Sequence, residues 1–186
     1  HFLNIVWGTN GIFKGNKMLK QMKKVLPESF SETKIPVNIV TFNNNTGIHK
    51  FWNTEDNISL PLAVRASMSL PFIFDPVKIN GDKHTDGGIT ANFPIDIFGT
   101  GENVVGLAFI SRESKKRREI NNKIDMIQAN LNGAIQNSMR ESLEDVKSSA
   151  KYMPIVTEHP GLDLFMTEQD VLSQISDGYH SIDRWL

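Results

Sequence analysis

The feature that most constrains the fold is a nearly continuous apolar segment, residues 104–110, with the sequence Val-Val-Gly-Leu-Ala-Phe-Ile. The segment is too short to span a membrane, and it lacks the alternation of a strand with one solvated face. Such a run is typical of a strand that is buried on both faces of a sheet. Because helical and strand-like segments alternate around it, we predict an α/β fold with a largely parallel sheet.

The rest of the pattern divides into helices and strands. Apolar residues at three- and four-residue steps indicate helices, and short β-branched or alternating segments indicate strands. The predicted helices are 14–26, 61–68 with Ser59 as its N-cap, about 119–151, and one that opens at Thr167 and breaks at 176–178. The predicted strands are 36–42, 49–52, 72–74, 77–79, 104–110 and 154–156. No repeat or linker is visible, so we expect one domain over residues 1–186.

Composition excludes several classes of protein. The 186 residues are 39% hydrophobic and 22% charged, which is typical of a globular domain. The net charge of −1 gives no overall field that would attract nucleic acid or an anionic membrane. Cysteine is absent and the five histidines lack the spacing of metal ligands, so we expect neither a metal nor a cofactor. We interpret the start at His1 as a cut inside a longer protein, which leaves the compartment open.

The candidate catalytic group is Asp86, which is followed by Gly87 and Gly88. Two glycines permit a turn with positive φ and a close approach of the backbone at the end of a short strand. A carboxylate held in this way can act as a general base toward a nucleophile or a water molecule. Asp-Gly-Gly is also a common turn sequence for steric reasons, so the tripeptide alone leaves both interpretations open.

Several segments resemble the patatin-like phospholipase family. The densest match is residues 86–96, Asp-Gly-Gly-Ile-Thr-Ala-Asn-Phe-Pro-Ile-Asp, followed by residues 63–74, Ala-Val-Arg-Ala-Ser-Met-Ser-Leu-Pro-Phe-Ile-Phe. Weaker matches extend the resemblance over nearly the whole chain. They are residues 11–15, 35–40, 46–47, 162–165 and 178–179.

The resemblance implies a lipid acyl hydrolase on a three-layer α/β fold with a mostly parallel central sheet. Members of the family use a serine–aspartate dyad without a histidine. The serine of a G-x-S-x-G elbow attacks the ester carbonyl, the aspartate accepts its proton, and a glycine-rich loop stabilises the oxyanion. The family's aspartate falls on Asp86, with Gly87 and Gly88 in the active-site loop. The implied partners are a phospholipid or other acyl lipid and, peripherally, a membrane.

The chain departs from the family pattern in its nucleophile. No serine stands two residues after any glycine, so the chain contains no G-x-S-x-G, and the glycine-rich loop is absent as well. In the family both precede the position of Val6. We therefore expect the chain to be the C-terminal part of a patatin-like domain, inactive without the missing N-terminal part. The alternative is a non-catalytic lipid-binding or interaction module, a degenerate relative that has lost the nucleophile.

Other polar residues near Asp86 are interpreted as structural. His84 lies on the same side of the strand, but the implied dyad needs no histidine, so we expect a surface residue. Ser67 and Ser69 lack an elbow and are expected to cap the helix end. Asn92 matches the asparagine of the family's N-x-P and is expected to fix the loop after Asp86 by side-chain hydrogen bonds.

For two features the sequence allows either a contact with lipid or a purely structural role. The basic run 115–118 is interpreted as a solvated loop rather than a headgroup site. The apolar stripe of the long helix is interpreted as core packing rather than a docking face. Phe51, Trp52 and Trp185 would help to bind lipid if they were exposed.

Overall fold

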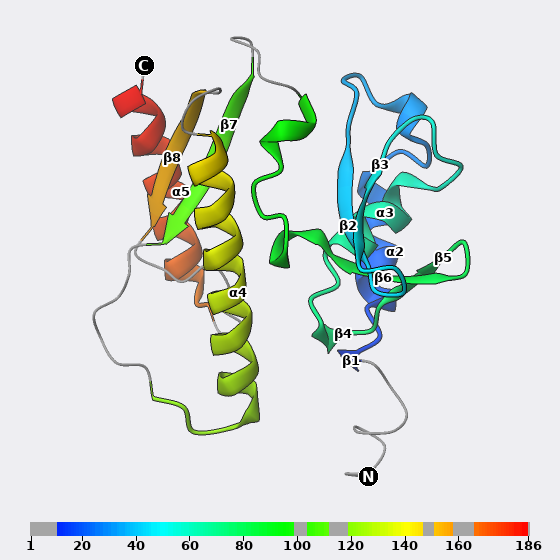
Figure 1. Ribbon diagram of the computed structural model, residues 1–186, viewed down its shortest axis with the longest axis horizontal. Coiled ribbons are helices and arrows are strands. Elements are labelled where there is room, and N and C mark those ends of the chain that lie inside the picture. The colour runs from blue at the N-terminus through cyan, green and yellow to red at the C-terminus, as the bar shows by residue number, and fades with distance from the viewer. Residues whose placement is uncertain (1–10, 99–103, 112–118, 147–150, 158–165, 186) are drawn as a thin grey trace. The chain divides into compact units, whose positions relative to one another are not determined.

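The structure, a computed structural model, describes residues 11–98, 104–111, 119–146, 151–157 and 166–185 (Figure 1). Helices and strands are mixed along the chain, as the α/β prediction requires at its coarsest level. The chain forms two compact units, His1–Gly88 and Ile89–Leu186. The expectation of a single domain stays a prediction.

The first unit contains a four-stranded sheet with the order β3-β2-β6-β5. Its strands are β2 (Ile39–Asn43), β3 (Ile48–Trp52), β5 (Val77–Ile79) and β6 (Asp82–Asp86). All neighbours in this sheet are antiparallel, which differs from the predicted parallel arrangement. For two of the three pairs the reason is local: turns of a few residues join β2 to β3 and β5 to β6, and such short connections join only antiparallel strands. Asn80 and Gly81 in the second turn both have positive φ, of 51° and 98°, as a tight hairpin turn requires.

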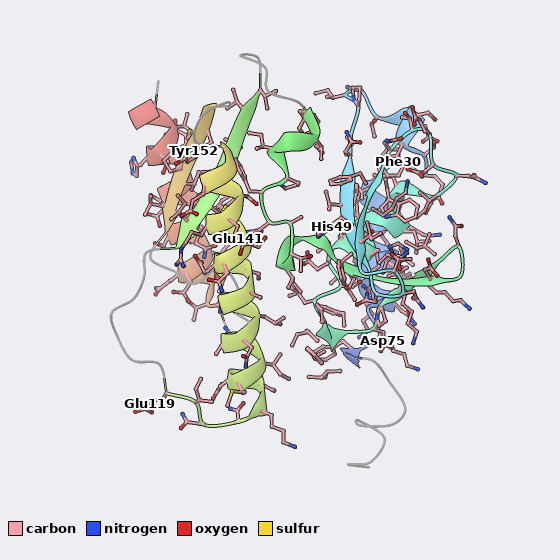
Figure 2. All side chains as sticks on the ribbon, in the orientation of Figure 1. Phe30, His49, Asp75, Glu119, Glu141 and Tyr152 are labelled. Carbon is pink, nitrogen blue, oxygen red and sulfur yellow. The ribbon has the colours of Figure 1, made fainter. Side chains whose placement is uncertain are left out.

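Helix α3 (Leu60–Ser67) packs against this sheet and begins as predicted. The Ser59 side chain accepts a hydrogen bond from the Leu62 N–H at 3.4 Å, and Pro61 occupies the first turn, where its missing N–H leaves no partner unsatisfied. Apolar residues from the helix, the sheet and the preceding loop form the core. Its buried members are Phe30, which is labelled in Figure 2, with Trp52, Leu60, Ala63, Ala66 and Ile79.

A second, two-stranded sheet in this unit pairs β1 (Gly11–Phe13) with β4 (Phe72–Phe74) in parallel, as Figure 1 shows. Helix α2 (Asn16–Val25) follows β1 and packs against α3. Gly15, directly before α2, has a φ of 68°, which lies in the left-handed region. A short 3-10 helix, η1 (Phe30–Glu32), leads from α2 toward the sheet.

The second unit pairs β7 (Val105–Ser111) with β8 (Lys151–Thr157) in parallel over seven residues. Helix α4 (Lys123–Val146) supplies Met139 to a core that also contains Phe93, Ile95 and Ala108. A 3-10 helix, η3 (Ile95–Phe98), precedes β7. Strand β7 approaches this region so closely that a Cβ atom on Gly106 would overlap the side chains of Phe93 and Ile95.

The strand predicted at residues 104–110 is confirmed in position, but the expectation of burial on both faces is not met. Gly106 and Ala108 are buried, whereas Val105, Leu107 and Phe109 are more than half exposed. The two faces of a strand alternate, so Gly106 and Ala108 lie on the face that packs against Phe93 and Ile95. The opposite face is covered over β8, where Met153 and Ile155 are buried, but it is left exposed over β7.

The last helix, α5 (Glu168–Trp185), shows a second difference from the predictions. It begins where the sequence predicts, with the Asp170 N–H donating to Thr167 Oγ1 at 3.3 Å. The predicted break at 176–178 is wrong, because the helix continues through Gly178. A Cβ at this position would meet nothing within 4 Å, so glycine here is a weak helix former rather than a steric requirement.

Replacement of Gly15 by alanine is expected to destabilise the fold more than the same change at Gly47. Both glycines have left-handed φ values, of 68° and 72°, so both substitutions carry a backbone penalty of roughly 1 kcal/mol. A Cβ on Gly15 would also overlap the buried Arg65 guanidinium, whereas one on Gly47 would meet nothing within 4 Å. Displacing Arg65 adds about 2 kcal/mol from hydrogen bonds to a charged group. Urea denaturation of the two variants measures the difference, and equal losses of stability would contradict the packing described for Gly15.

Candidate active site around Asp86

Asp86 is the last residue of β6 and is fixed on both sides by backbone hydrogen bonds. Its N–H donates to the carbonyl oxygen of Ser69 at 3.0 Å. Its Oδ1 atom accepts a hydrogen bond from the Gly88 N–H at 2.7 Å, which closes a turn around the carboxylate. In the sheet register Asp86 stands opposite Thr41 of β2. The residue is therefore held through its own backbone N–H and through the chain that immediately follows it.

Gly87 is required by the close approach of β2. A Cβ at this position would lie 2.8 Å from Val40 Cγ1 and 2.9 Å from the Val40 carbonyl carbon, closer than side-chain atoms pack. The predicted close approach of the backbone is confirmed here. The predicted positive φ is not found, because Gly87 and Gly88 begin the short 3-10 helix η2 (Gly87–Ile89) instead of a left-handed turn.

The environment of Asp86 makes its carboxylate more basic. Burial raises the pKa of Asp86 above that of an exposed aspartate, and the hydrogen bond from the Gly88 N–H opposes this shift. Burial disfavours the ionised form because water solvates it poorly there. A carboxylate with a raised pKa accepts a proton more readily than an ordinary aspartate, which is the property that a general base needs.

The backbone partner of Asp86 belongs to a buried polar group at the end of α3. Ser69 is fully buried, and its hydroxyl donates to the Arg65 carbonyl oxygen at 2.8 Å while it accepts from Arg65 Nη1. The Ser69 hydroxyl is thus engaged in both directions by Arg65. Its structural role is confirmed, and its carbonyl oxygen anchors the catalytic candidate.

Arg65 is not among the predicted site residues, yet it organises the region around Ser69. Its side chain is 3% exposed, and its guanidinium also donates to the carbonyl oxygens of Lys14 at 3.0 Å, Gly15 at 3.2 Å and Asp75 at 3.2 Å. Burial lowers the pKa of Arg65, and the charge of Asp75 opposes the shift. A single arginine on the otherwise apolar face of a short helix was the available signal, because a buried arginine needs several acceptors.

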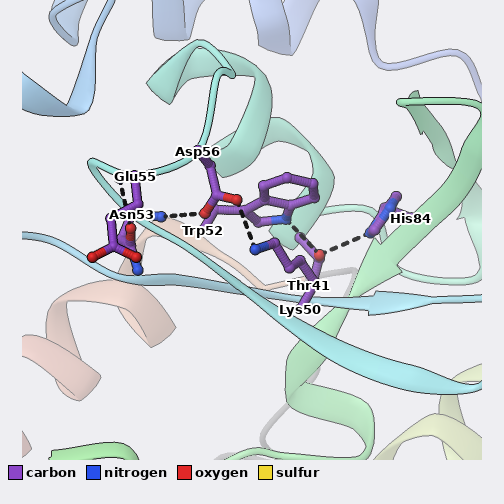
Figure 3. A network of polar contacts seen from close by, with 7 residues as sticks. All are labelled: Thr41, Lys50, Trp52, Asn53, Glu55, Asp56 and His84. Carbon is purple, nitrogen blue, oxygen red and sulfur yellow. Dashed lines mark hydrogen bonds and ion pairs between the residues drawn. The ribbon is translucent and has the colours of Figure 1, made fainter.

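His84 is not the surface residue that the sequence predicts. It is 2% exposed, and its Nδ1 atom lies 3.0 Å from Thr41 Oγ1 (Figure 3). Trp52 Nε1 donates to the same Thr41 oxygen at 2.8 Å, so the threonine hydroxyl has its own proton free to donate to His84. Burial lowers the pKa of His84, with the nearby Asp82 opposing the shift, which favours the neutral ring that this hydrogen bond needs.

The same network corrects the expectation for Trp52. The indole is 3% exposed and packs edge-on against the His84 ring, with centroids 5.2 Å apart, so Trp52 does not offer a surface to lipid. Phe51 is half-buried. The side chain of Trp185, like the basic run 115–118, lies outside the described residues.

Asn92 in the second unit is held through its backbone. Its N–H donates to the Ser138 side chain of α4 at 3.0 Å. The side-chain hydrogen bonds that the sequence predicts for Asn92 stay a prediction. The apolar stripe of α4 contributes Leu131 and Met139 to buried positions, in agreement with core packing, although Ile124 and Met126 on the first turns are exposed.

A comparison with protein families decides the relationship that the motifs indicate. The model of the family described as Patatin-like phospholipase matches residues 2–98, which is more than half of the chain. The chain belongs to the patatin-like phospholipase family. The matched segment includes Asp86 and its turn, Ser69 and Arg65.

Two curated relatives of this patatin-like chain are themselves uncharacterised. Protein R571 of Acanthamoeba polyphaga mimivirus is 28% identical over 138 residues, which cover 66% of this chain and 46% of the relative. Protein YqhO of Bacillus subtilis (strain 168) is 27% identical over 143 residues, which cover 70% of this chain and 47% of the relative. The chain therefore spans about half the length of the curated relatives that it matches. In the parts of the patatin-like chain that the structure describes, no helix is long and apolar enough to cross a bilayer.

The raised pKa of Asp86 predicts how its replacement changes stability. Because the pKa is higher in the folded than in the unfolded state, this carboxyl supports folding fully at pH values below its unfolded pKa. That support is lost as the pH rises through the folded pKa. An asparagine in its place would be uncharged and would keep an oxygen to accept from the Gly88 N–H. We expect Asp86→Asn to unfold at a higher temperature than the wild type at neutral pH, with the difference shrinking on acidification. Thermal unfolding of both proteins, monitored by circular dichroism from neutral to acidic pH, tests the sign of this difference. A melting temperature of Asp86→Asn below that of the wild type at neutral pH would contradict the prediction.

Proposed function

We propose that this chain contributes the general base, Asp86, to a lipid acyl hydrolase that uses a serine–aspartate dyad. The support is the combination of family membership with an anchored, half-buried carboxylate whose pKa is raised. In this proposal the serine elbow and the glycine-rich oxyanion loop come from a part of the protein outside this chain. The intact domain then has the three-layer architecture with a mostly parallel central sheet, to which the parallel pair β7–β8 is suited.

The proposed reaction proceeds through an acyl-enzyme. The serine oxygen attacks the ester carbonyl carbon while Asp86 accepts the serine proton, and backbone N–H groups stabilise the oxyanion. The tetrahedral intermediate collapses, the C–O bond of the ester breaks, and the leaving alcohol takes the proton from Asp86. Water then attacks the acyl-enzyme with Asp86 again as the base, and the carboxylic acid leaves as the serine regains its proton.

The anchoring of Asp86 explains how a carboxylate serves here without an imidazole. Gly87 brings β2 close to the turn, and the Gly88 N–H holds one carboxylate oxygen. Within the described residues no hydrogen bond to the second oxygen, Oδ2, is found, so we assign this oxygen to the serine hydroxyl. His84 is engaged with Thr41, which leaves Asp86 as the candidate base.

The substitution Asp86→Asn in the full-length protein is expected to abolish most ester hydrolysis. Loss of a general base lowers the rate by roughly 100-fold or more, whereas substrate binding is largely kept. Asp82→Asn is a matched control, since Asp82 lies on the same strand, where it accepts a hydrogen bond from Asn43. Initial rates on a short-chain nitrophenyl ester and on phosphatidylcholine measure both variants.

Retained activity in Asp86→Asn would reject the assignment of the base. A full-length protein that has no G-x-S-x-G elbow and no ester hydrolysis would instead support the non-catalytic lipid-binding or interaction module. The two outcomes are separable, because the first requires an active wild type and the second requires an inactive one.

The pH dependence of kcat/KM in the wild type should show the ionisation of Asp86. The base must be ionised to accept a proton, so kcat/KM is expected to fall on acidification through a pKa above that of an exposed aspartate. A profile that stays flat down to the range of ordinary aspartate residues would contradict this prediction. The measurement uses a soluble ester, so that vesicle binding does not contribute to the profile.

A further inference from the structure

Helix α2 and the residues before its start carry an unbalanced positive charge. Five lysines lie between residues 14 and 24, and the segment from Gly11 to Pro27 contains no acidic residue. This segment contributes +5 to a chain whose net charge is −1, so the remaining residues together carry −6. All five lysines are exposed, and within the part of the chain that the structure describes none of them forms an ion pair.

The lysines lie on one side of α2. Lys17, Lys20 and Lys24 follow one another at three- and four-residue steps, which places them on one face of a helix. The half-buried Met18 and Met22 lie on another side, and α2 packs against α3. No residue of α2 is fully buried. The helix therefore presents a continuous basic face to the surroundings.

Exposed aromatic residues lie beside the start of α2. The parallel register pairs Gly11 with Phe72 and Phe13 with Phe74, so the three phenylalanines share one face of the β1–β4 pair. Phe13 is 58% exposed and Phe72 is 61% exposed. Phe72 also has a φ of 67°, a conformation that L-residues other than glycine avoid. Neither burial nor backbone preference in this chain accounts for a phenylalanine at position 72.

A cleft of about 470 Å³ joins the aromatic and the basic residues. Phe13, Phe74 and Met18 supply apolar walls, and Lys14 and Lys17 stand on the same cleft. We call the combined area the lysine–aromatic surface. It consists of Phe13, Phe72, Phe74, Lys14, Lys17, Lys20, Lys23 and Lys24.

We propose that the lysine–aromatic surface docks the protein onto an anionic lipid bilayer. Lysines without ion-pair partners would attract anionic lipid headgroups. The adjacent exposed phenylalanines would insert at the boundary between the headgroups and the acyl chains. The concentration of charge on one helix face favours a planar anionic partner, because a flat surface can meet Lys17, Lys20 and Lys24 at once. A nucleic acid would match the lysines but not the cleft walled by Met18 and Phe74.

The surface is connected directly to the candidate base. Arg65 binds the carbonyl oxygens of Lys14 and Gly15 with the same guanidinium that binds Ser69, whose carbonyl oxygen holds Asp86. Docking would thus fix the membrane relative to the element that carries Asp86. The purpose of the docking, delivery of an acyl lipid, rests on the proposed function, whereas the lipid contact itself does not.

The test measures binding of the full-length protein to vesicles of phosphatidylcholine alone and of phosphatidylcholine mixed with phosphatidylserine. Lys20→Glu/Lys24→Glu is compared with Lys78→Glu/Lys83→Glu, which makes the same change of charge at exposed lysines of β5 and β6. Each lysine near an anionic bilayer contributes about fivefold to partitioning, so the first variant should bind the mixed vesicles at least about 20-fold more weakly. The control should bind like the wild type, and added salt should weaken wild-type binding.

The variant Phe72→Gly distinguishes an effect on vesicle binding from an effect on the stability of the fold. Glycine adopts a φ of 67° without strain, so this variant should melt no lower than the wild type while it binds the mixed vesicles more weakly. A purely structural role for Phe72 would lower the melting temperature instead.

Any of three vesicle results would overturn the proposal: equal binding to both kinds of vesicle, unchanged binding of Lys20→Glu/Lys24→Glu, or an equal loss of binding in the Lys78→Glu/Lys83→Glu control. Binding of duplex DNA that depends on Lys20 and Lys24, without vesicle binding, would assign the surface to nucleic acid and would also overturn it. Hydrolysis of a soluble short-chain ester should be the same in the wild type and in Lys20→Glu/Lys24→Glu. Vesicle binding that depends on these lysines in a protein without esterase activity would uphold the docking surface and reject the proposed hydrolase.

Discussion

The buried guanidinium of Arg65 is the interaction on which the arrangement around Asp86 depends. A charged group without water needs many acceptors, and Arg65 finds them in the Ser69 hydroxyl and in three backbone carbonyl groups. These acceptors belong to the end of α3, to the entry into α2 and to the end of β4. One side chain therefore fixes three segments, of which the entry into α2 is about 50 residues away in the sequence, and the Ser69 carbonyl oxygen in turn accepts from the Asp86 N–H.

Burial and anchoring act together on Asp86. The partial loss of water raises its pKa, while the hydrogen bond from Gly88 keeps the raised pKa from rising further and orients one oxygen. A half-buried carboxylate of this kind is destabilising in its ionised form, so neighbouring contacts must hold it in place. Gly87 allows the contact between β2 and the turn after Asp86, because only a residue without a Cβ lets β2 approach so closely.

The local elements follow from short-range physics and were largely predictable. The Ser59 cap, the proline in the first turn of α3 and the apolar strand at 104–110 agree with the structure because neighbouring residues determine them. Asp86 and the family motifs were also visible in the sequence. The antiparallel sheet was predictable in principle from its short turns, whereas the uncovered face of β7 was not, because coverage depends on which elements pack against the strand.

The sequence by itself determined the elements, the motif around Asp86 and the membership of the patatin-like family. Only the tertiary structure decided the environments of the polar residues. It buried His84 and Trp52 around Thr41, placed the Ser69 hydroxyl in hydrogen bonds with Arg65, and left Phe13 and Phe72 exposed beside the lysines of α2. The physical reason is that burial and hydrogen bonding are set by contacts between segments far apart in the chain, whereas a sequence pattern reports only the preferences of neighbours.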